Sequence, residues 1–108
     1  MRKRQIEEPR KALSRPVVHI LLALADGAKH GYAIKQDVEE GTDGSIRLGP
    51  GTLYEAIQRL QDSGLIEETD ASGEAPANDQ QAQRRFYALS PRGWDVLHDE
   101  VRHVAAIV

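Results

Sequence analysis

The chain has 108 residues, of which 40% are hydrophobic and 29% charged, so it suits one soluble domain and leaves little room for a second. It has no cysteine and no apolar run near the roughly 18 residues of a membrane span, which excludes disulfides, thiolate chemistry and a membrane partner and favours a cytoplasmic location. The net charge of −3 argues mildly against nucleic acid as a partner. However, basic residues cluster at 1–12 and 84–92 and acidic residues at 64–83, and the local charge governs contact with phosphates.

The chain begins with a polar, basic segment, residues 1–11, which we expect to form an N-terminal arm that can attract an anionic partner. The first helix is predicted to begin after Ser14, a good capping residue, with Pro16 in its first turn. Residues 17–24 are apolar on almost every side, which is typical of a buried central helix. The Asp-Gly pair at 26–27 ends this helix.

A second helix is predicted from about His30 to Glu40, because Ile34 and Val38 lie four residues apart on one apolar face. We expect the imidazole of His30 to cap or pack at the start of this helix. The next eight residues, 42–49, are too many for the shortest helix-turn-helix connection. Apolar residues alternate with a polar one at positions 46–48, which predicts a minimal strand there.

The third helix is predicted to start near Pro50 and to close at Gly64. Leu53, Ile57 and Leu60 recur four and three residues apart, which defines a narrow buried stripe. The outward-facing residues of this helix are then Gly51, Thr52, Tyr54, Glu55, Gln58, Arg59 and Gln61.

Two strands are predicted after the third helix, at residues 65–69 and 85–89. The loop between them, 71–83, is polar and holds no aliphatic residue larger than alanine, so the strands form a hairpin with a long tip. Ser90 and Pro91 are then a cap and a first-turn proline for the last helix.

This order of helices and strands predicts a winged helix-turn-helix, a mainly α fold with a small antiparallel β wing. We assign residues 12–90 to this domain. Residues 91–108 form a C-terminal dimerisation helix, with Trp94 expected to anchor it to the core.

In a winged helix the third helix normally enters the DNA major groove. The Gly-Pro-Gly opening leaves the backbone N–H of Gly51 exposed at the positive end of the helix dipole, where a phosphate can approach. Thr52 and Tyr54 can donate to phosphates. Gln58 can pair with adenine, and Arg59 can reach a phosphate or guanine. The alternative is that proline and glycine simply start a helix, as they do in many proteins.

Two further groups of residues are candidates for contact with the DNA backbone. Tyr32, at the start of the second helix, can pack its ring and present its hydroxyl, or it can be a half-buried core residue. Arg84 and Arg85 stand where the wing returns, and one of them should point outward because strand neighbours face opposite ways. The alternative for the arginines is a solvated pair that balances Glu67 and Glu68.

The apolar stripe of the last helix predicts a two-fold dimer in which the first and last helices of two chains pack together. The alternative is that the last helix folds back onto its own first helix. A cavity at the dimer interface could also bind a small aromatic or apolar effector. The expected dimer-interface residues are Leu97, Val101, Val104 and Val108.

Catalysis has little support in the sequence. The four histidines lack the spacing of a metal pair on one helical face, since His98 and His103 are five residues apart. No serine or threonine stands in a nucleophile motif, and no glycine-rich phosphate loop follows a strand. We therefore predict neither an enzyme nor a cofactor or metal site.

Four motifs in this order and spacing resemble the PadR family of bacterial transcriptional regulators over about residues 17–97. They are HGYAI at 30–34, LGPGTLYEAI at 48–57, GLI at 64–66 and RRFYALS at 84–90, followed by Gly93. The resemblance implies a dimeric winged-helix repressor, often of genes for detoxification, efflux or phenolic-acid metabolism, that a small molecule releases. The chain is similar to the short type, in which the first and last helices form the dimer. The DNA contacts that the resemblance implies are Tyr32, Gly51, Thr52, Tyr54, Arg84 and Arg85.

The sequence thus leaves two hypotheses. The first is a ligand-responsive repressor that binds a palindromic operator in double-stranded DNA as a homodimer. The second is a winged-helix module that binds another protein without direct DNA contact, which the acidic wing and the net charge of −3 favour.

Overall fold

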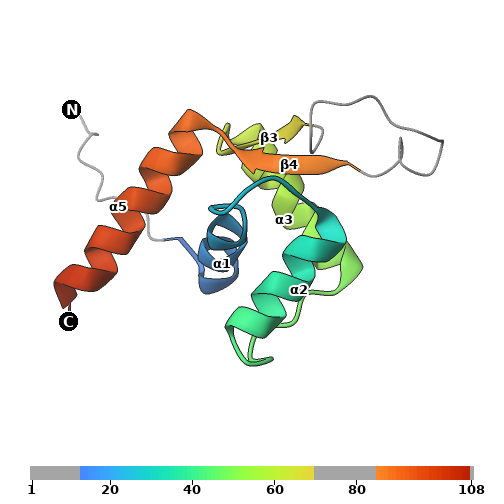
Figure 1. Cartoon of the computed structure of the whole chain (residues 1–108), viewed down its shortest axis with the longest axis horizontal. Coiled ribbons are helices and arrows are strands. Elements are labelled where there is room, and N and C mark those ends of the chain that lie inside the picture. The colour runs from blue at the N-terminus through green and yellow to red at the C-terminus, as the bar shows by residue number, and fades with distance from the viewer. Residues whose placement is uncertain (1–12, 70–84, 108) are drawn as a thin grey trace, which may run out of the picture.

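The computed structural model describes residues 13–69 and 85–107, with side chains through residue 103 (Figure 1). The predicted arm, the wing loop, Arg84 and Val108 lie outside the described residues. The elements are α1 (Arg15–Ala23), β2 (Lys29–His30), α2 (Gly31–Gly41), α3 (Pro50–Asp62), β3 (Ile66–Thr69), β4 (Phe86–Leu89) and α5 (Pro91–Ile107). This is a mainly helical fold with a small antiparallel sheet, as the sequence predicted.

The sheet has three strands in the order β2-β4-β3, and both pairings are antiparallel. The third strand predicted at 46–48 is wrong, since that segment is loop and the third strand is Lys29–His30. The apolar alternation at 46–48 has another cause: Leu48 is buried and Ile46 packs against the core from the loop. β2 is only two residues long and is a strand because β4 pairs with it. No local sequence pattern predicts this pairing.

Helix α1 lies at the centre of the domain and packs against both α2 and α5 (Figure 1). Ile20 and Leu21 are fully buried, and Ile34 of α2 and Ile57 of α3 meet the same core. The prediction that α1 is buried on nearly every side holds in part, because Val17 and Val18 are half-buried and Leu22 is 41% exposed. One side of α1 therefore carries apolar surface that the described residues leave uncovered.

Three predicted helix caps are present. Ser14 Oγ accepts a hydrogen bond from the Val17 N–H at 3.3 Å, and His30 Nδ1 accepts one from the Ala33 N–H at 3.3 Å. Ser90 Oγ accepts from the Gly93 N–H at 2.9 Å. Each cap satisfies a backbone donor that a helix start leaves without a partner.

Lys29 ties the end of α1 to α2. Its ammonium contacts the carbonyl oxygen of Ala23 and the carboxylate of Asp26, and lies 3.1 Å from a carboxylate oxygen of Asp37. Burial alone would lower the pKa of Lys29, but the hydrogen bonds and charges of the two acids outweigh it and raise the pKa. The hydrogen bond from Lys29 in turn lowers the pKa of Asp26.

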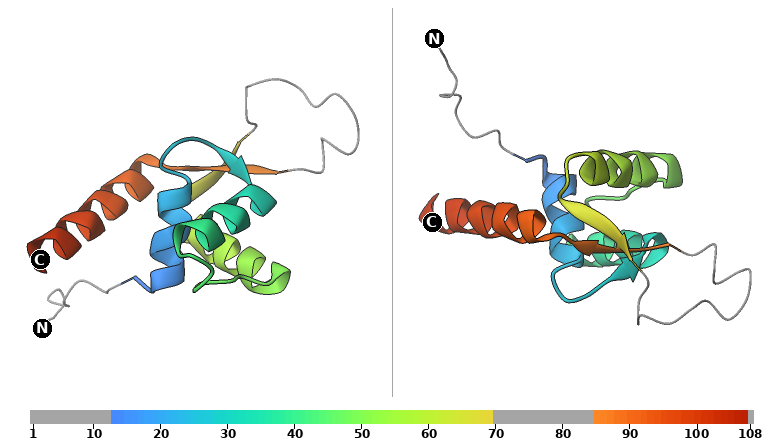
Figure 2. Two further views of the ribbon diagram at one scale, coloured as in Figure 1. Left: turned by 60° about the horizontal axis from the view of Figure 1, so that its bottom comes forward. Right: turned by 90° about the horizontal axis from the view of Figure 1, so that it is seen from above.

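Helix α5 leaves the sheet on the side of α1 that is opposite to α2 and α3 (Figure 2). Leu97, expected in a dimer interface, is instead 4% exposed within the chain's own core, so it has little surface left for a second subunit. Trp94 is 44% exposed, so the expectation that it anchors α5 to the core is wrong. The two residues lie three positions apart and so only about 60° apart around α5, which puts Trp94 near the edge of the face that Leu97 buries.

Candidate nucleic-acid interface

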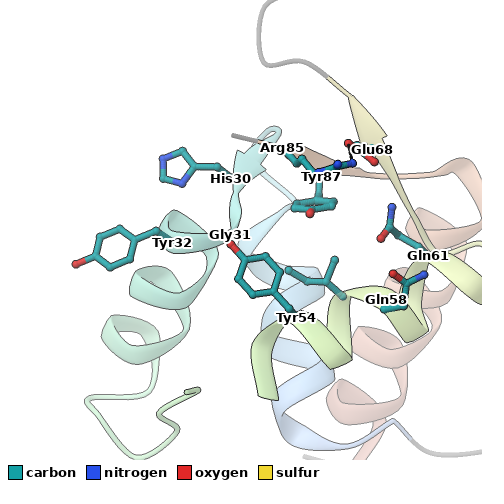
Figure 3. Close-up of a pocket in the computed structure, with 10 residues that line it drawn as sticks. His30, Gly31, Tyr32, Tyr54, Gln58, Gln61, Glu68, Arg85 and Tyr87 are labelled. Carbon is teal, nitrogen blue, oxygen red and sulfur yellow. Dashed lines mark hydrogen bonds and ion pairs between the residues drawn. The ribbon is translucent and has the colours of Figure 1, made fainter. Parts of the chain in front are cut away.

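A groove of about 880 Å³ lies between the start of α2, the exposed face of α3 and the base of the wing (Figure 3). The groove brings together side chains from three separate segments of the chain. Its lining residues are His30, Gly31, Tyr32, Tyr54, Ile57, Gln58, Gln61, Glu68, Arg85 and Tyr87.

The amino end of α3 is open, as the sequence predicted. Gly49 precedes the helix in an extended conformation and supplies no side-chain cap, and Pro50 has no N–H of its own. Gly51 is exposed, and a Cβ placed on it would meet no atom within 4 Å. The first-turn N–H groups and the positive end of the helix dipole therefore face open space, which suits an approaching anion.

Tyr54 lies against the start of α2. Its ring is 51% exposed, and a Cβ added to Gly31 would lie 2.5 Å from the Tyr54 hydroxyl oxygen. Figure 3 shows the hydroxyl end of Tyr54 directed at Gly31. The glycine thus allows α3 to approach the amino end of α2, a role that no local sequence pattern predicts.

Tyr32 is also exposed, at 59%, which removes the alternative of a half-buried core tyrosine. The Lys35 ammonium lies 5.8 Å from the centre of its ring, within the range of a cation–π contact. Lys35 also pairs with Glu39 one turn further along α2, at 2.9 Å. In Figure 3 the Tyr32 ring points away from Tyr54, so the two tyrosines extend to different sides of the α2 start.

The remaining predicted residues on α3 are all exposed, but they do not all line the groove. Thr52 and Arg59 are exposed without lining it. Gln58 lines the groove, and its amide donates to Asp62 Oδ1 at 3.0 Å. Gln61 belongs to the same lining, although no specific role was predicted for it.

The base of the wing supplies Arg85 and, beside it, Glu68. The Arg85 guanidinium donates to Glu68 Oε2 at 2.8 Å across the hairpin. Tyr87 pairs with Glu68 in the β3–β4 register and is almost fully buried. Burial raises the pKa of the Tyr87 hydroxyl, and the negative charge of Glu68 raises it further. The sequence identified Arg85 as a site residue, and the alternative in which it balances a glutamate of the facing strand is observed with Glu68. Tyr87 was not expected in the site, because only the strand register brings it there.

A second groove, of about 510 Å³, lies between α1 and α5 and is mostly apolar. Val101, predicted for the dimer interface, is 47% exposed here, opposite the exposed Leu22 of α1. The side chains of the other two predicted interface residues, Val104 and Val108, lie outside the described residues. The lining of this groove is Leu13, Arg15, Val18, His19, Leu22, Glu100 and Val101.

Two other features are absent from residues 13–69 and 85–107. No group of three or more histidine, aspartate or glutamate side chains there is arranged to hold a metal ion. No helix in the same residues combines the length and the apolar character needed to cross a bilayer.

Comparison with known proteins places these features in a family. A sequence model of the transcriptional regulator PadR-like family matches residues 20–99. Transcriptional regulator Rv3488 of Mycobacterium tuberculosis is 32% identical over 87 residues, covering 79% of this chain and 71% of that protein. An uncharacterized 37.1 kDa protein in transposon TN4556 of Streptomyces fradiae is 35% identical over 88 residues. That match covers 82% of this chain, which spans only 22% of the transposon protein.

The fold also matches a solved structure. The PadR family transcription regulator from hypervirulent Clostridium difficile superposes with a TM-score of 0.72 at 23% identity. The match covers 87% of this chain and 91% of that one. At this level of identity the likeness shows a common winged-helix fold.

Proposed function

Since the chain belongs to the PadR-like family of transcriptional regulators, whose members are not enzymes, we propose that it is a homodimeric repressor that binds a palindromic operator. In this proposal the groove between α2, α3 and the wing base contacts double-stranded DNA. A small aromatic or apolar effector modulates the contact, and the protein acts in the cytoplasm.

The open amino end of α3 is the observation that carries the proposal. The helix starts at Gly49 without a side-chain cap, and the space around Gly51 is free. Tyr54 of α3 and Tyr32 of α2 are both exposed and line the same groove. A phosphate can reach the backbone N–H groups of α3 while the phenol hydroxyls donate to neighbouring phosphates.

The exposed face of α3 would then lie in the major groove. In this proposal Thr52 and Tyr54 near its start would contact the DNA backbone. Gln58 and Arg59 are about one turn further along and would meet base edges or phosphates. Arg85 at the wing base would contact a phosphate beside the groove. Because phosphate contacts release counterions, binding should weaken steeply as salt rises.

The groove between α1 and α5 supports the dimer and effector parts of the proposal. Leu22 and Val101 expose apolar surface on facing helices, which a second copy of the chain would bury. The volume of about 510 Å³ is in the range of small-molecule sites. A two-fold dimer predicts operator half-sites about one helical turn apart, roughly 34–36 Å.

The alternative function, a module that binds another protein, has one observation in its favour. Glu55 is exposed on α3, and Glu68 lines the same groove as the tyrosines. Carboxylates on a DNA-binding face oppose phosphates, and they would suit a basic protein surface instead. This alternative predicts no DNA binding even at low salt.

Fluorescence anisotropy with a labelled duplex from the chain's own upstream region tests the proposal. The unaltered chain should bind, and Thr52→Ala with Tyr54→Phe should weaken binding by about tenfold or more, since two hydrogen bonds from neutral hydroxyls to anionic phosphate oxygens are lost. Ser63→Ala removes a hydroxyl from the opposite end of α3 and should leave affinity unchanged. If the unaltered chain does not bind the duplex at low salt, the protein-binding alternative would be favoured.

A further inference from the structure

In the groove between α2, α3 and the wing base, Arg85 forms an ion pair with Glu68. Among the described residues that line the groove, Arg85 is the only lysine or arginine. Its guanidinium is held 2.8 Å from Glu68 Oε2 (Figure 3). The side chains are 65% and 42% exposed, so both remain within reach of solvent and of an incoming ligand.

The strand register directs this pair into the groove. Glu68 pairs with Tyr87, so their side chains share one face of the hairpin, and Arg85 lies two residues before Tyr87 on the same face. All three line the groove. Glu67 pairs with Ala88 and therefore faces the other side of the hairpin. The sequence carries two adjacent glutamates, but only Glu68 is placed against Arg85.

A carboxylate and a phosphate present the same chemistry to a guanidinium, which is anionic oxygens that accept its N–H donors. The Glu68 carboxylate therefore occupies the position on Arg85 that a DNA phosphate oxygen would take. An exposed pair of this kind is weakly stabilising and can be exchanged. After the exchange, the charge of Glu68 stays in the groove and repels the phosphate that has replaced it.

We propose that Glu68 is an internal competitor for DNA phosphate at Arg85, which lowers the affinity of the wing base for any duplex. The inference rests on the proposed function, because it assigns a regulating residue to the same DNA-binding groove. Phosphate contacts carry no sequence information, so Glu68 should weaken binding to the operator and to unrelated DNA in similar proportion.

The competition should also change how DNA affinity depends on salt concentration. When a phosphate displaces Glu68 from Arg85, the freed carboxylate takes up a cation, which offsets the counterion that the phosphate releases. With a neutral residue at position 68 this offset disappears. The slope of log affinity against log salt should then steepen by up to about one for each Arg85 that contacts DNA.

The test measures anisotropy of the full chain with the upstream duplex and with an unrelated duplex, at several salt concentrations near about 100 mM. Glu68→Gln keeps the shape of the side chain, and it should raise the affinity for both duplexes by about three- to tenfold. Glu67→Gln makes the same charge change on the opposite face of β3, and it should change affinity by less than about twofold.

Arg85→Gln separates competition from a structural role. If the pair merely held the hairpin together, breaking it from either side would weaken DNA binding. Competition predicts opposite effects: Glu68→Gln strengthens binding and Arg85→Gln weakens it. In Arg85→Gln/Glu68→Gln, most of the gain should vanish, because the cation that Glu68 masks is gone.

Three results would decide against the inference. Glu68→Gln that binds DNA as the unaltered chain does, or more weakly, would overturn it and leave the proposed function standing. An equal gain from Glu67→Gln would show a general charge effect and also overturn it. An unaltered chain that binds no DNA would overturn the proposed function and this inference together. Thermal unfolding of each variant confirms that the comparison is between folded proteins.

Discussion

At the scale of single residues, the candidate site depends on a glycine, Gly31, because a larger residue there would clash with Tyr54 as it is placed. Gly31 is the first residue of α2, and the Tyr54 hydroxyl lies 2.5 Å from the position where a Cβ would stand. The contact sets how closely the amino ends of α2 and α3 approach each other. It also holds the Tyr54 hydroxyl at the edge of the groove, where a phosphate would pass.

Gly31→Ala should therefore weaken DNA binding without unfolding the domain. The hydroxyl end of Tyr54 is the movable end of its side chain, so the ring can swing away from the new methyl group. We expect about a five- to tenfold loss of affinity, the equivalent of one misplaced hydrogen bond. Anisotropy measures the affinity, and urea unfolding should show a change below about 1 kcal/mol.

The matched control for this prediction is Gly41→Ala at the other end of α2. A Cβ there would meet nothing within 4 Å, and alanine is the better helix former. Gly41→Ala should bind DNA as the unaltered chain does. If Gly31→Ala also bound normally, the Gly31–Tyr54 contact would have no part in positioning the interface.

At the scale of elements, one serine joins the wing to α5. The Ser90 hydroxyl accepts from the Gly93 N–H and donates to the Gly64 carbonyl at 2.6 Å, while the Ser90 N–H donates to the Leu65 carbonyl at 3.0 Å. A Cβ on Gly93 would lie 2.0 Å from the same Leu65 oxygen. The start of α5 is therefore fixed closely against the chain that enters β3.

Ser90→Ala should destabilise the domain by about 1–3 kcal/mol. The substitution removes a helix cap and leaves the Gly64 carbonyl without its side-chain donor in a part-buried position. Urea unfolding at a fixed protein concentration measures the loss as a lower midpoint with an unchanged slope. Ser63→Ala, which removes an exposed hydroxyl from the end of α3, should stay within about 0.5 kcal/mol. A Ser90→Ala midpoint equal to that of Ser63→Ala would contradict this account.

The helices could be predicted from the sequence because their signals are local. Apolar spacing marked the buried face of α3, and Ser14, His30 and Ser90 each cap the helix that the pattern assigned to them. The open start of α3 was likewise visible in its Gly-Pro-Gly sequence.

The features that could not be predicted depend on contacts between distant segments. β2 is a strand only because β4 runs beside it, and Gly31 meets Tyr54 across two helices. In the sequence, the apolar residues of α5 form one continuous stripe. In the structure, α1 and the sheet cover Leu97 but leave Val101 exposed. The sequence shows which residues are apolar, but it does not show where a neighbouring element stops covering them.

At the scale of the whole molecule, the two grooves lie on different parts of the domain. The proposed DNA groove is formed by α2, α3 and the wing, whereas the apolar groove is formed by α1 and α5 (Figure 1). A second copy that covers Leu22 and Val101 would therefore leave the DNA groove of each chain open.

Val101→Asp should convert the proposed dimer into a monomer, because a charge would then replace apolar surface that the second copy is proposed to cover. Sedimentation at micromolar concentration measures the mass directly. His103→Asp introduces the same negative charge on an exposed residue about 200° further around α5, and should leave the dimer intact. Loss of the dimer should also cost affinity for a two-site palindrome far more than for a duplex with one half-site, since only the dimer engages both sites at once. An unaltered chain that sediments as a monomer would contradict both the dimer and the palindrome.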